Sequence, residues 1–199
     1  MLGSKQLEEV LAAVGDLLEA KSEDVGIVVV GGASLNLLGL IERTTGDVDV
    51  IARVHPSDDG PEQALPEQAL IPPEPMPESL MDAVETVARD FDLPANWMNA
   101  VIGAQWDLGL PPRLEEDLTW RTYGGLRVGL AGRRTLIALK LFAAVDQGPE
   151  SVHVQDLVSL RPNEEELEEA AGWVRAQDAS PEFATMTHEV VQYVRRHST

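Results

Sequence analysis

The sequence predicts a mixed α/β (α+β) fold, in which a small mixed β-sheet is backed by helices and the C-terminal third adds a helical layer. Three observations predict it. Two β-branched segments, 26–30 and 47–52, flank a short helical segment. A hairpin pattern at 118–131, with a Gly-Gly turn, is followed by helical patterns to the end of the chain. The length of 199 residues suits one domain with a helical annex, and we expect its parts to be 1–132 and 133–199.

The N-terminal part alternates between helical and extended patterns. Apolar residues recur at helical spacing over 4–20, where Ser4 is a suitable N-cap, and 33–40 predicts a short second helix. The segment 55–79 differs because it is rich in proline, and we expect a loosely packed surface insertion there. A ligand for a proline-binding domain is the alternative for that insertion. Helical spacing then returns over 79–91.

The C-terminal third contains four helical patterns. Asn163 followed by Glu166 is typical of a capping box, and Ser180-Pro181 is typical of a helix that starts with proline at its first position. The four segments are 135–145, 152–160, 163–176 and 180–196. Such a run of helices predicts a second layer or subdomain.

The composition narrows the classes of function. With 34 acidic and 15 basic residues the net charge is −19, which argues against a protein that coats nucleic acid, although a local basic groove is compatible with it. The absence of cysteine excludes disulfide scaffolds, cysteine–zinc sites and thiol nucleophiles. No apolar run approaches the roughly 20 residues that span a bilayer, and the first residues lack a signal-peptide pattern. We therefore expect a cytoplasmic protein with no membrane partner.

A Gly-Gly turn between a strand and a helix is the first candidate site. Gly31, Gly32 and Ser34 lie where backbone N–H groups and a helix N-terminus could bind phosphate oxygens. The spacing matches neither the dinucleotide-binding glycine motif nor the P-loop. A tight turn without a ligand is an equal interpretation of these residues alone.

Two acids on the second strand form the second candidate. Asp47 and Asp49 are separated by one residue, so the two-residue period of a strand places both carboxylates on one face. Such a pair at the edge of an apolar strand suits a divalent cation, Mg²⁺ or Mn²⁺, which binds through carboxylate oxygens. The alternative is a strand with two solvated acids.

Lys140 is the third candidate, since it is one of three lysines and lies within an apolar helix. Its ammonium group must reach solvent, form an ion pair or bind an anion. Arg133 is two turns earlier on the same face, so the two could present a cationic stripe to phosphate. Asp156, also in an apolar setting, could instead pair with Lys140 as a structural salt bridge.

These motifs together resemble the DNA polymerase β-like nucleotidyltransferase superfamily. Gly31-Gly32-Ala33-Ser34, followed by Thr45-Gly46-Asp47-Val48-Asp49-Val50, is similar to the glycine turn and Asp-x-Asp strand of that superfamily. The segments around Lys140 and Asp156, together with Trp97-Met98-Asn99, resemble elements of the AbiEii- and MenT-like nucleotidyltransferase toxins and of related families of unassigned function. The resemblance covers scattered motifs between residues 26 and 160 and implies a nucleotidyltransferase fold.

The resemblance implies Mg²⁺-dependent transfer of a nucleoside monophosphate from an NTP to an acceptor, which in the toxin branch is commonly the 3′ end of tRNA. It also implies an antitoxin protein as a possible partner. The roles that it implies are triphosphate binding by Gly31, Gly32 and Ser34, metal binding by Asp47 and Asp49, neutralisation of phosphate charge by Lys140, and orientation of Lys140 by Asp156. Thr45 matches a Ser or Thr that the toxin branch carries near the metal, where a partner could modify it.

The sequence departs from this pattern in three ways. No motif supports a third metal-binding carboxylate, for which Asp107 and Asp117 are the candidates, and Asn99 stands where an acid is expected. The net charge suits a tRNA-binding protein poorly. Five arginines could form a local RNA-binding patch or merely a solvated hairpin face; these are Arg113, Arg121, Arg127, Arg133 and Arg134.

Two further hypotheses follow from these departures. The chain could be a catalytically inactive binding module with the same fold. It could also be a transferase whose acceptor is a small molecule or a protein, which its low content of basic residues would suit.

Overall fold

The computed structural model, which describes residues 1–54 and 69–198, has the mixed α/β fold that the sequence predicts. Its sheet has the strand order β3-β2-β1-β6-β5, and β4 pairs with β2 off this path. The β1–β6 and β2–β4 pairs are parallel and the others are antiparallel. The strands are β1 (Val25–Val30), β2 (Val48–Val54), β3 (Leu70–Ile71), β4 (Met98–Asn99), β5 (Leu118–Tyr123) and β6 (Leu126–Ala131).

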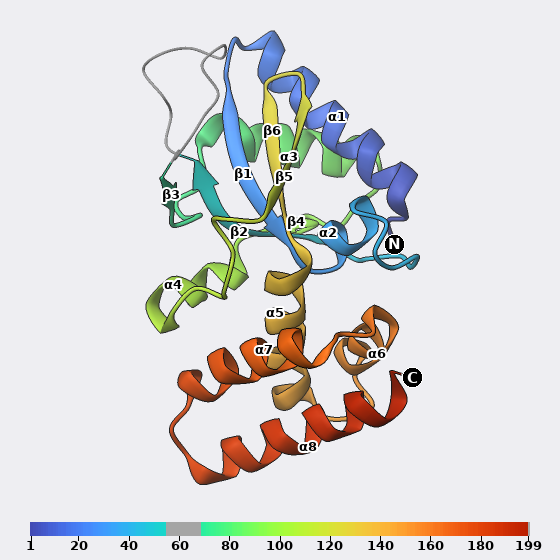
Figure 1. The fold of residues 1–199 in the computed structure, drawn as a ribbon. Helices are drawn as coiled ribbons and strands as arrows, with labels where there is room; N and C mark the ends of the chain where they lie inside the picture. The colour runs from blue at the N-terminus through green and yellow to red at the C-terminus, as the bar shows by residue number, and fades with distance from the viewer. Residues whose placement is uncertain (55–68, 199) are drawn as a thin grey trace.

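The helices lie around one face of the sheet and at one of its ends (Figure 1). They are α1 (Ser4–Ala20), α2 (Gly31–Leu37), α3 (Glu78–Asp90), the 3-10 helix η1 (Val101–Ala104), α4 (Gln105–Leu108), α5 (Arg133–Gln147), α6 (Val152–Leu160), α7 (Glu164–Gln177) and α8 (Pro181–His197). Within residues 1–54 and 69–198, no helix combines the length and apolar character that crossing a bilayer requires.

Strand β1 is buried on both faces, as its continuous apolar run predicts. Ile27 and Val29 belong to the hydrophobic core that α1 and α3 cover, whereas Val28 and Val30 belong to the core on the other side. This division follows the two-residue period of a strand. The second core continues into the C-terminal helices, so β1 ties both halves of the molecule together.

The four C-terminal helices form the predicted helical layer. Helix α5 packs against α6, α7 and α8, below the sheet in Figure 1. The capping box is confirmed, because the Asn163 side chain accepts from the Glu166 N–H and Glu166 accepts from the Asn163 N–H. Ser180 caps α8, which begins at Pro181. A domain boundary at residue 132 stays a prediction.

Several boundaries differ from the prediction. The N-cap of α1 is Gly3 rather than Ser4. Because glycine has no side chain, no side-chain hydrogen bond caps this helix. Helix α2 begins two residues early, at Gly31, and β2 begins after Asp47. Strands β3 and β4, η1 and α4 were not predicted because none is longer than four residues.

The proline-rich segment falls into two parts. Residues 55–68 lie outside the described residues, so the expectation of a loose insertion is untested there. From residue 70 onwards the segment is anchored at two points, because Leu70 is buried in β3 and Pro73 is buried against Gly103 of η1. The other residues to 77 are exposed or half-buried, and the expectation of a surface insertion stays a prediction.

Candidate functional site

The Gly-Gly turn lies directly beneath the acidic strand β2. Gly31 has a φ of 68°, and a Cβ atom there would lie 2.5 Å from Oδ2 of Asp49. A Cβ on Gly32 would lie 2.4 Å from Oγ1 of Thr45 and 3.2 Å from Nη2 of Arg43. Only glycine allows this positive φ together with such close approach. The two glycines are therefore needed to bring the acidic strand against the backbone at the start of α2.

Ser34 does not belong to the binding surface, which corrects the role that the resemblance implies. Its side chain is fully buried, and its hydroxyl group donates to the Val29 carbonyl oxygen over 2.6 Å. The hydroxyl thus closes the turn between β1 and α2. Its contribution to the site is structural.

We expect Ser34→Ala to lower the free energy of unfolding by about 1 kcal/mol, the usual contribution of one buried hydrogen bond. The affinity for Mg²⁺ and nucleotide should remain unchanged, since the hydroxyl faces the core. Urea denaturation and calorimetric titration measure the two quantities separately. A loss of nucleotide affinity without a loss of stability would restore Ser34 to the binding surface.

Thr45 orients Asp47 instead of facing solvent. Thr45 is buried, and its backbone pairs with Leu2 in an isolated bridge. Its hydroxyl group lies 3.3 Å from the Asp47 carbonyl oxygen and 3.4 Å from the Asp47 carboxylate. This contact fixes the Asp47 side chain just before β2 begins. Burial leaves the hydroxyl inaccessible to a modifying partner in this conformation.

Asp49 carries the most perturbed carboxyl group of the site. Burial, followed by repulsion from Asp47, raises its pKa to about 6, although the Asn99 hydrogen bond and Lys140 act in the opposite direction. Nδ2 of Asn99 lies 3.4 Å from Oδ1 of Asp49, because β4 places the two residues opposite each other. A raised carboxyl pKa next to a second acid indicates that its negative charge is incompletely compensated.

Lys140 and Asp156 form the ion pair that one of the two sequence interpretations expected. Nζ of Lys140 lies 2.8 Å from Oδ2 of Asp156, and both side chains are buried. A third partner was missed: Arg43 binds the same carboxylate through Nε at 2.8 Å and Nη2 at 2.9 Å. We call Arg43, Lys140 and Asp156 the cationic triad, in which Lys140 and Asp156 are buried and the Arg43 side chain is 26% exposed. Two cations share one carboxylate, which leaves the triad with a positive charge.

His153 also contacts Lys140, with 3.4 Å between Nδ1 and Nζ. Burial, and next the positive charge of Lys140, lower the pKa of His153. The imidazole is therefore neutral at pH 7 and adds no charge to the triad. His153 lies in the first turn of α6.

A cavity of about 260 Å³ joins these groups. Its polar lining comes from five elements of the fold and consists of Gly31, Asp49, Gln105, Lys140 and His153. Gln105, which the sequence analysis missed, lies where η1 meets α4. A larger cavity of about 510 Å³ opens between α5, α6 and α8, but it is mostly apolar and contains none of the predicted site residues.

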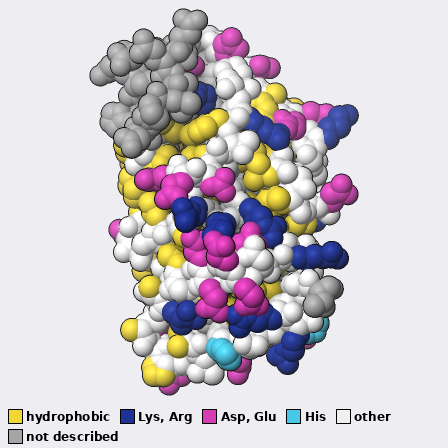
Figure 2. Space-filling model, viewed as in Figure 1, with side chains coloured by type: hydrophobic (Ala, Val, Ile, Leu, Met, Phe, Trp, Pro, Cys, Tyr) yellow, Lys and Arg dark blue, Asp and Glu magenta, His cyan; other side chains and the backbone are white. Residues whose placement is uncertain are grey.

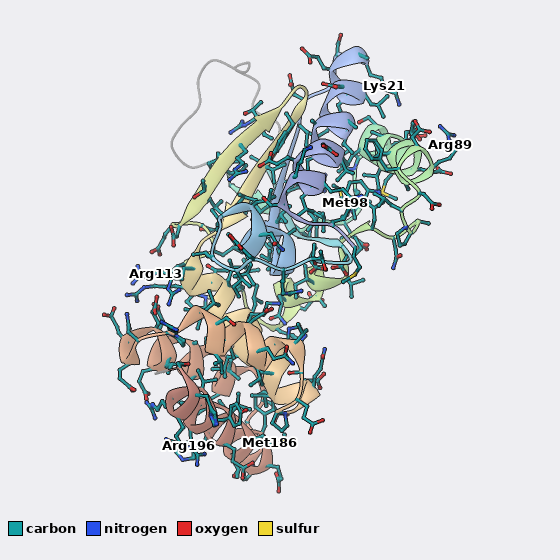
Figure 3. The ribbon with its side chains drawn as sticks, turned by 90° about the vertical axis from the view of Figure 1, so that its right-hand side faces the viewer. Lys21, Arg89, Met98, Arg113, Met186 and Arg196 are labelled. Carbon is teal, nitrogen blue, oxygen red and sulfur yellow. The ribbon has the colours of Figure 1, made fainter. Side chains whose placement is uncertain are left out.

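Asn99 occupies the position beside Asp49 where a third carboxylate was sought. Met98, labelled in Figure 3, belongs to the hydrophobic core that α1 and α3 cover, and the pairing of β4 with β2 places Asn99 next to Asp49. Within the described ranges no three His, Cys, Asp or Glu side chains cluster as a metal site. Asp107 is exposed on α4, and Asp117 lies against Gly132, so neither lines the cavity.

The expected arginine patch is largely neutralised within the molecule. The salt bridges are Arg113 with Glu116 and Glu169, Arg121 with Glu8, Arg133 with Glu166, and Arg134 with Glu165 and Glu169. The Arg127 guanidinium lies 5.2 Å from the centre of the Trp120 ring. The face in Figure 2 accordingly shows mixed acidic and basic side chains instead of one basic field. Arg133 also does not extend a cationic stripe from Lys140, since it binds Glu166 and the Leu160 carbonyl oxygen.

The acidic pair suits a hard divalent cation. Asp47 and Asp49 are close enough that repulsion raises the pKa of Asp49, and the positive charge of Lys140 lowers it. Two carboxylates are the usual protein contribution to a Mg²⁺ ion that also binds substrate phosphates and water. The donor atoms of this site are all oxygen, as Mg²⁺ and Mn²⁺ prefer.

Comparison of the chain with protein-family models, with curated proteins and with solved structures finds no match. The chain itself is a mixed α/β protein in which one residue each of the glycine turn, the acidic pair and the cationic triad, namely Gly31, Asp49 and Lys140, lines one cavity.

Proposed function

We propose that this protein is a Mg²⁺-dependent nucleotidyltransferase, which transfers a nucleoside monophosphate from an NTP to an acceptor. The observation that supports it most is the convergence of two opposite charge clusters at one cavity. Asp49 and Lys140 line the cavity; Asp47 is close enough to Asp49 to raise its pKa, and Asp156 with Arg43 extends the positive cluster from Lys140. A metal-bound triphosphate needs both, because the metal requires carboxylates and the phosphates require cations.

In the proposed reaction, an acceptor hydroxyl oxygen bonds to the α-phosphorus, the bond from the α-phosphorus to the oxygen that bridges to the β-phosphorus breaks, and pyrophosphate leaves. The hydroxyl proton passes to water. A Mg²⁺ ion held by Asp47 and Asp49 would stabilise charge on the phosphate oxygens. Lys140 balances negative charge as the pyrophosphate leaves, and Asp156 holds Lys140 in place. Gly31 lines the cavity, so its bare backbone would allow phosphate oxygens to approach closely, whereas Gly32 is buried against Thr45 outside the cavity lining.

The test of this function measures label transfer from α-labelled NTP, with Mg²⁺, to total tRNA, to protein and to small-molecule acceptors. We expect Asp47→Asn and Lys140→Met each to lower the transfer rate at least about a hundredfold, the usual effect of removing one group that stabilises transition-state charge. Asp107→Asn is the matched control, because that exposed acid neither lines the cavity nor acts on the pKa of Asp49, as Asp47 does. Transfer that survives in Asp47→Asn would overturn the proposed role of the acidic pair.

The 3′ end of tRNA is the first acceptor to test, because the resemblance to the AbiEii- and MenT-like toxins implies it. An antitoxin partner and a cytoplasmic location belong to the same proposal. The arginines that form salt bridges within the molecule give tRNA binding little electrostatic support. A small molecule or a protein is therefore the alternative acceptor for the same transfer reaction.

A catalytically inactive nucleotide-binding module is the second candidate function. Asn99 favours it, since an amide replaces a carboxylate beside Asp49. Tight binding of Mg²⁺ and NTP with no transfer to any acceptor would support this candidate and overturn the first. Asn99→Asp provides a sharper comparison, because appearance of transfer in that variant alone would identify Asn99 as the cause of inactivity.

A further inference from the structure

The larger cavity of the molecule lies between α5, α6 and α8, away from the residues of the proposed transfer site. Its volume is about 510 Å³, within the roughly 300–1,000 Å³ of typical ligand pockets. Its apolar lining consists of Val145, Pro149, Val154, Met186, Val190 and Tyr193. A concave site of this size with mostly apolar walls suits a small organic ligand.

The protein itself covers the α8 side of this cavity only in part. Met186, labelled on the helical layer in Figure 3, is 43% exposed. Tyr193 is half-buried, and its ring stacks on that of His197 with 4.0 Å between the ring centroids. A ligand that covers these side chains would remove apolar surface from water, which is favourable. The flexible Met186 side chain can adapt to apolar groups of different shapes.

Two opposite charges accompany the apolar walls. Glu189 and Arg196 both line the cavity, and both are exposed. They are close to two helical turns apart on α8, so they lie on one face of it and about 10 Å apart along the helix axis. Among the described residues neither forms an ion pair, and Arg196 donates only from Nε, to the Gln192 carbonyl oxygen over 3.0 Å. A carboxylate and a guanidinium group are therefore available to a ligand in this cavity.

We propose that this cavity binds a short apolar peptide with free termini, whose ammonium group pairs with Glu189 and whose carboxylate pairs with Arg196. An apolar acid or an apolar amine would engage only one of these two charges, whereas a peptide with both termini free engages both. Three residues of extended chain span about 10 Å, so a tripeptide matches the separation along α8. No residue of the transfer reaction takes part, so this site is independent of the proposed function.

The experiment is calorimetric titration of the full chain with leucyl-alanyl-leucine, and with the same tripeptide acetylated at its N-terminus or amidated at its C-terminus. We expect each capped peptide to bind about fivefold more weakly than the free one, because each lacks one ion pair with an exposed side chain. Equal affinities of the three peptides would overturn the proposal. So would a free peptide that does not bind at millimolar concentration.

Two variants assign each end of the peptide to its partner. Glu189→Gln should lower the affinity for the free peptide about fivefold and leave the affinity for the acetylated peptide unchanged. Arg196→Gln should act in the same way, with the amidated peptide unaffected. Glu182→Gln is the matched control, because it removes an exposed acid of α8 that lies outside the cavity lining, and it should change none of the affinities. If Glu189→Gln weakens the free and the acetylated peptides equally, the pairing of Glu189 with the ammonium group is wrong.

Discussion

Asp156→Ala is expected to lower the free energy of unfolding by about 3–5 kcal/mol, the cost of leaving buried charges without their partner. The Asp156 carboxylate is 2% exposed and contacts both Arg43 and Lys140. Its removal leaves two cations facing each other beside a cavity. Urea denaturation, with the midpoint and slope fitted together, measures the loss.

Removing Lys140 instead of Asp156 should lower the free energy of unfolding much less. Lys140→Met leaves Asp156 bound to Arg43 through two hydrogen bonds, so we expect a loss of only about 1 kcal/mol. Asp82→Ala is the surface control, because the Asp82–Lys21 pair is exposed and should contribute at most about 0.5 kcal/mol. Equal losses in Asp156→Ala and Lys140→Met would contradict the view that Asp156 anchors two cations.

Asp49→Asn is expected to abolish Mg²⁺-dependent transfer and yet to stabilise the fold at pH 7.5. The pKa of Asp49 is raised from 3.8 to about 6, so the folded state holds this proton more tightly than the unfolded chain does. Stability therefore falls as the pH rises from about 4 to about 6 and remains lower above that range. Removing the ionisable group should stabilise the protein by about 1–2 kcal/mol at pH 7.5, allowing for the partial exposure of Asp49 to solvent.

The pH dependence separates this effect from a general change in packing. At pH 4 the folded state holds the proton almost fully and the unfolded chain holds it only in part, so most of the destabilisation is absent and Asp49→Asn should give only a small gain there. Adding Mg²⁺ at pH 7.5 should raise the melting temperature of the wild type and not that of the variant, because the cation binds the ionised acid. A stability gain that is the same at pH 4 and pH 7.5 would contradict the assigned role of the Asp49 charge.

The regular elements could be predicted because their signals are local. The apolar run of β1 predicts a strand buried on both faces, and its alternate residues do divide between the two cores. The capping box at the start of α7 was also predicted from two residues three positions apart. Short elements such as β4 and η1 could not be predicted, because two to four residues are too few to show a recurring pattern.

The site was only partly predictable from the sequence. Gly31, Asp47, Asp49 and Lys140 were singled out as unusual residue types in their local setting, and the structure brings Gly31, Asp49 and Lys140 to one cavity. Ser34 was misassigned, since a hydroxyl after a glycine turn can face either the ligand or the core. The hydrogen bond from the Ser34 hydroxyl group to the Val29 carbonyl oxygen shows that this hydroxyl faces the core.

The sequence alone determined the mixed α/β class, the order of the long elements, the glycine turn and the acidic pair, because periodicity and residue type act over a few neighbouring positions. Only the tertiary structure decided which side chains of the site contact one another. Arg43 and Asp156 are 113 residues apart, Asn99 reaches Asp49 through a two-residue strand, and Gln105 lies in a four-residue helix. Contacts between such distant segments depend on how the whole chain packs, and no local pattern encodes them.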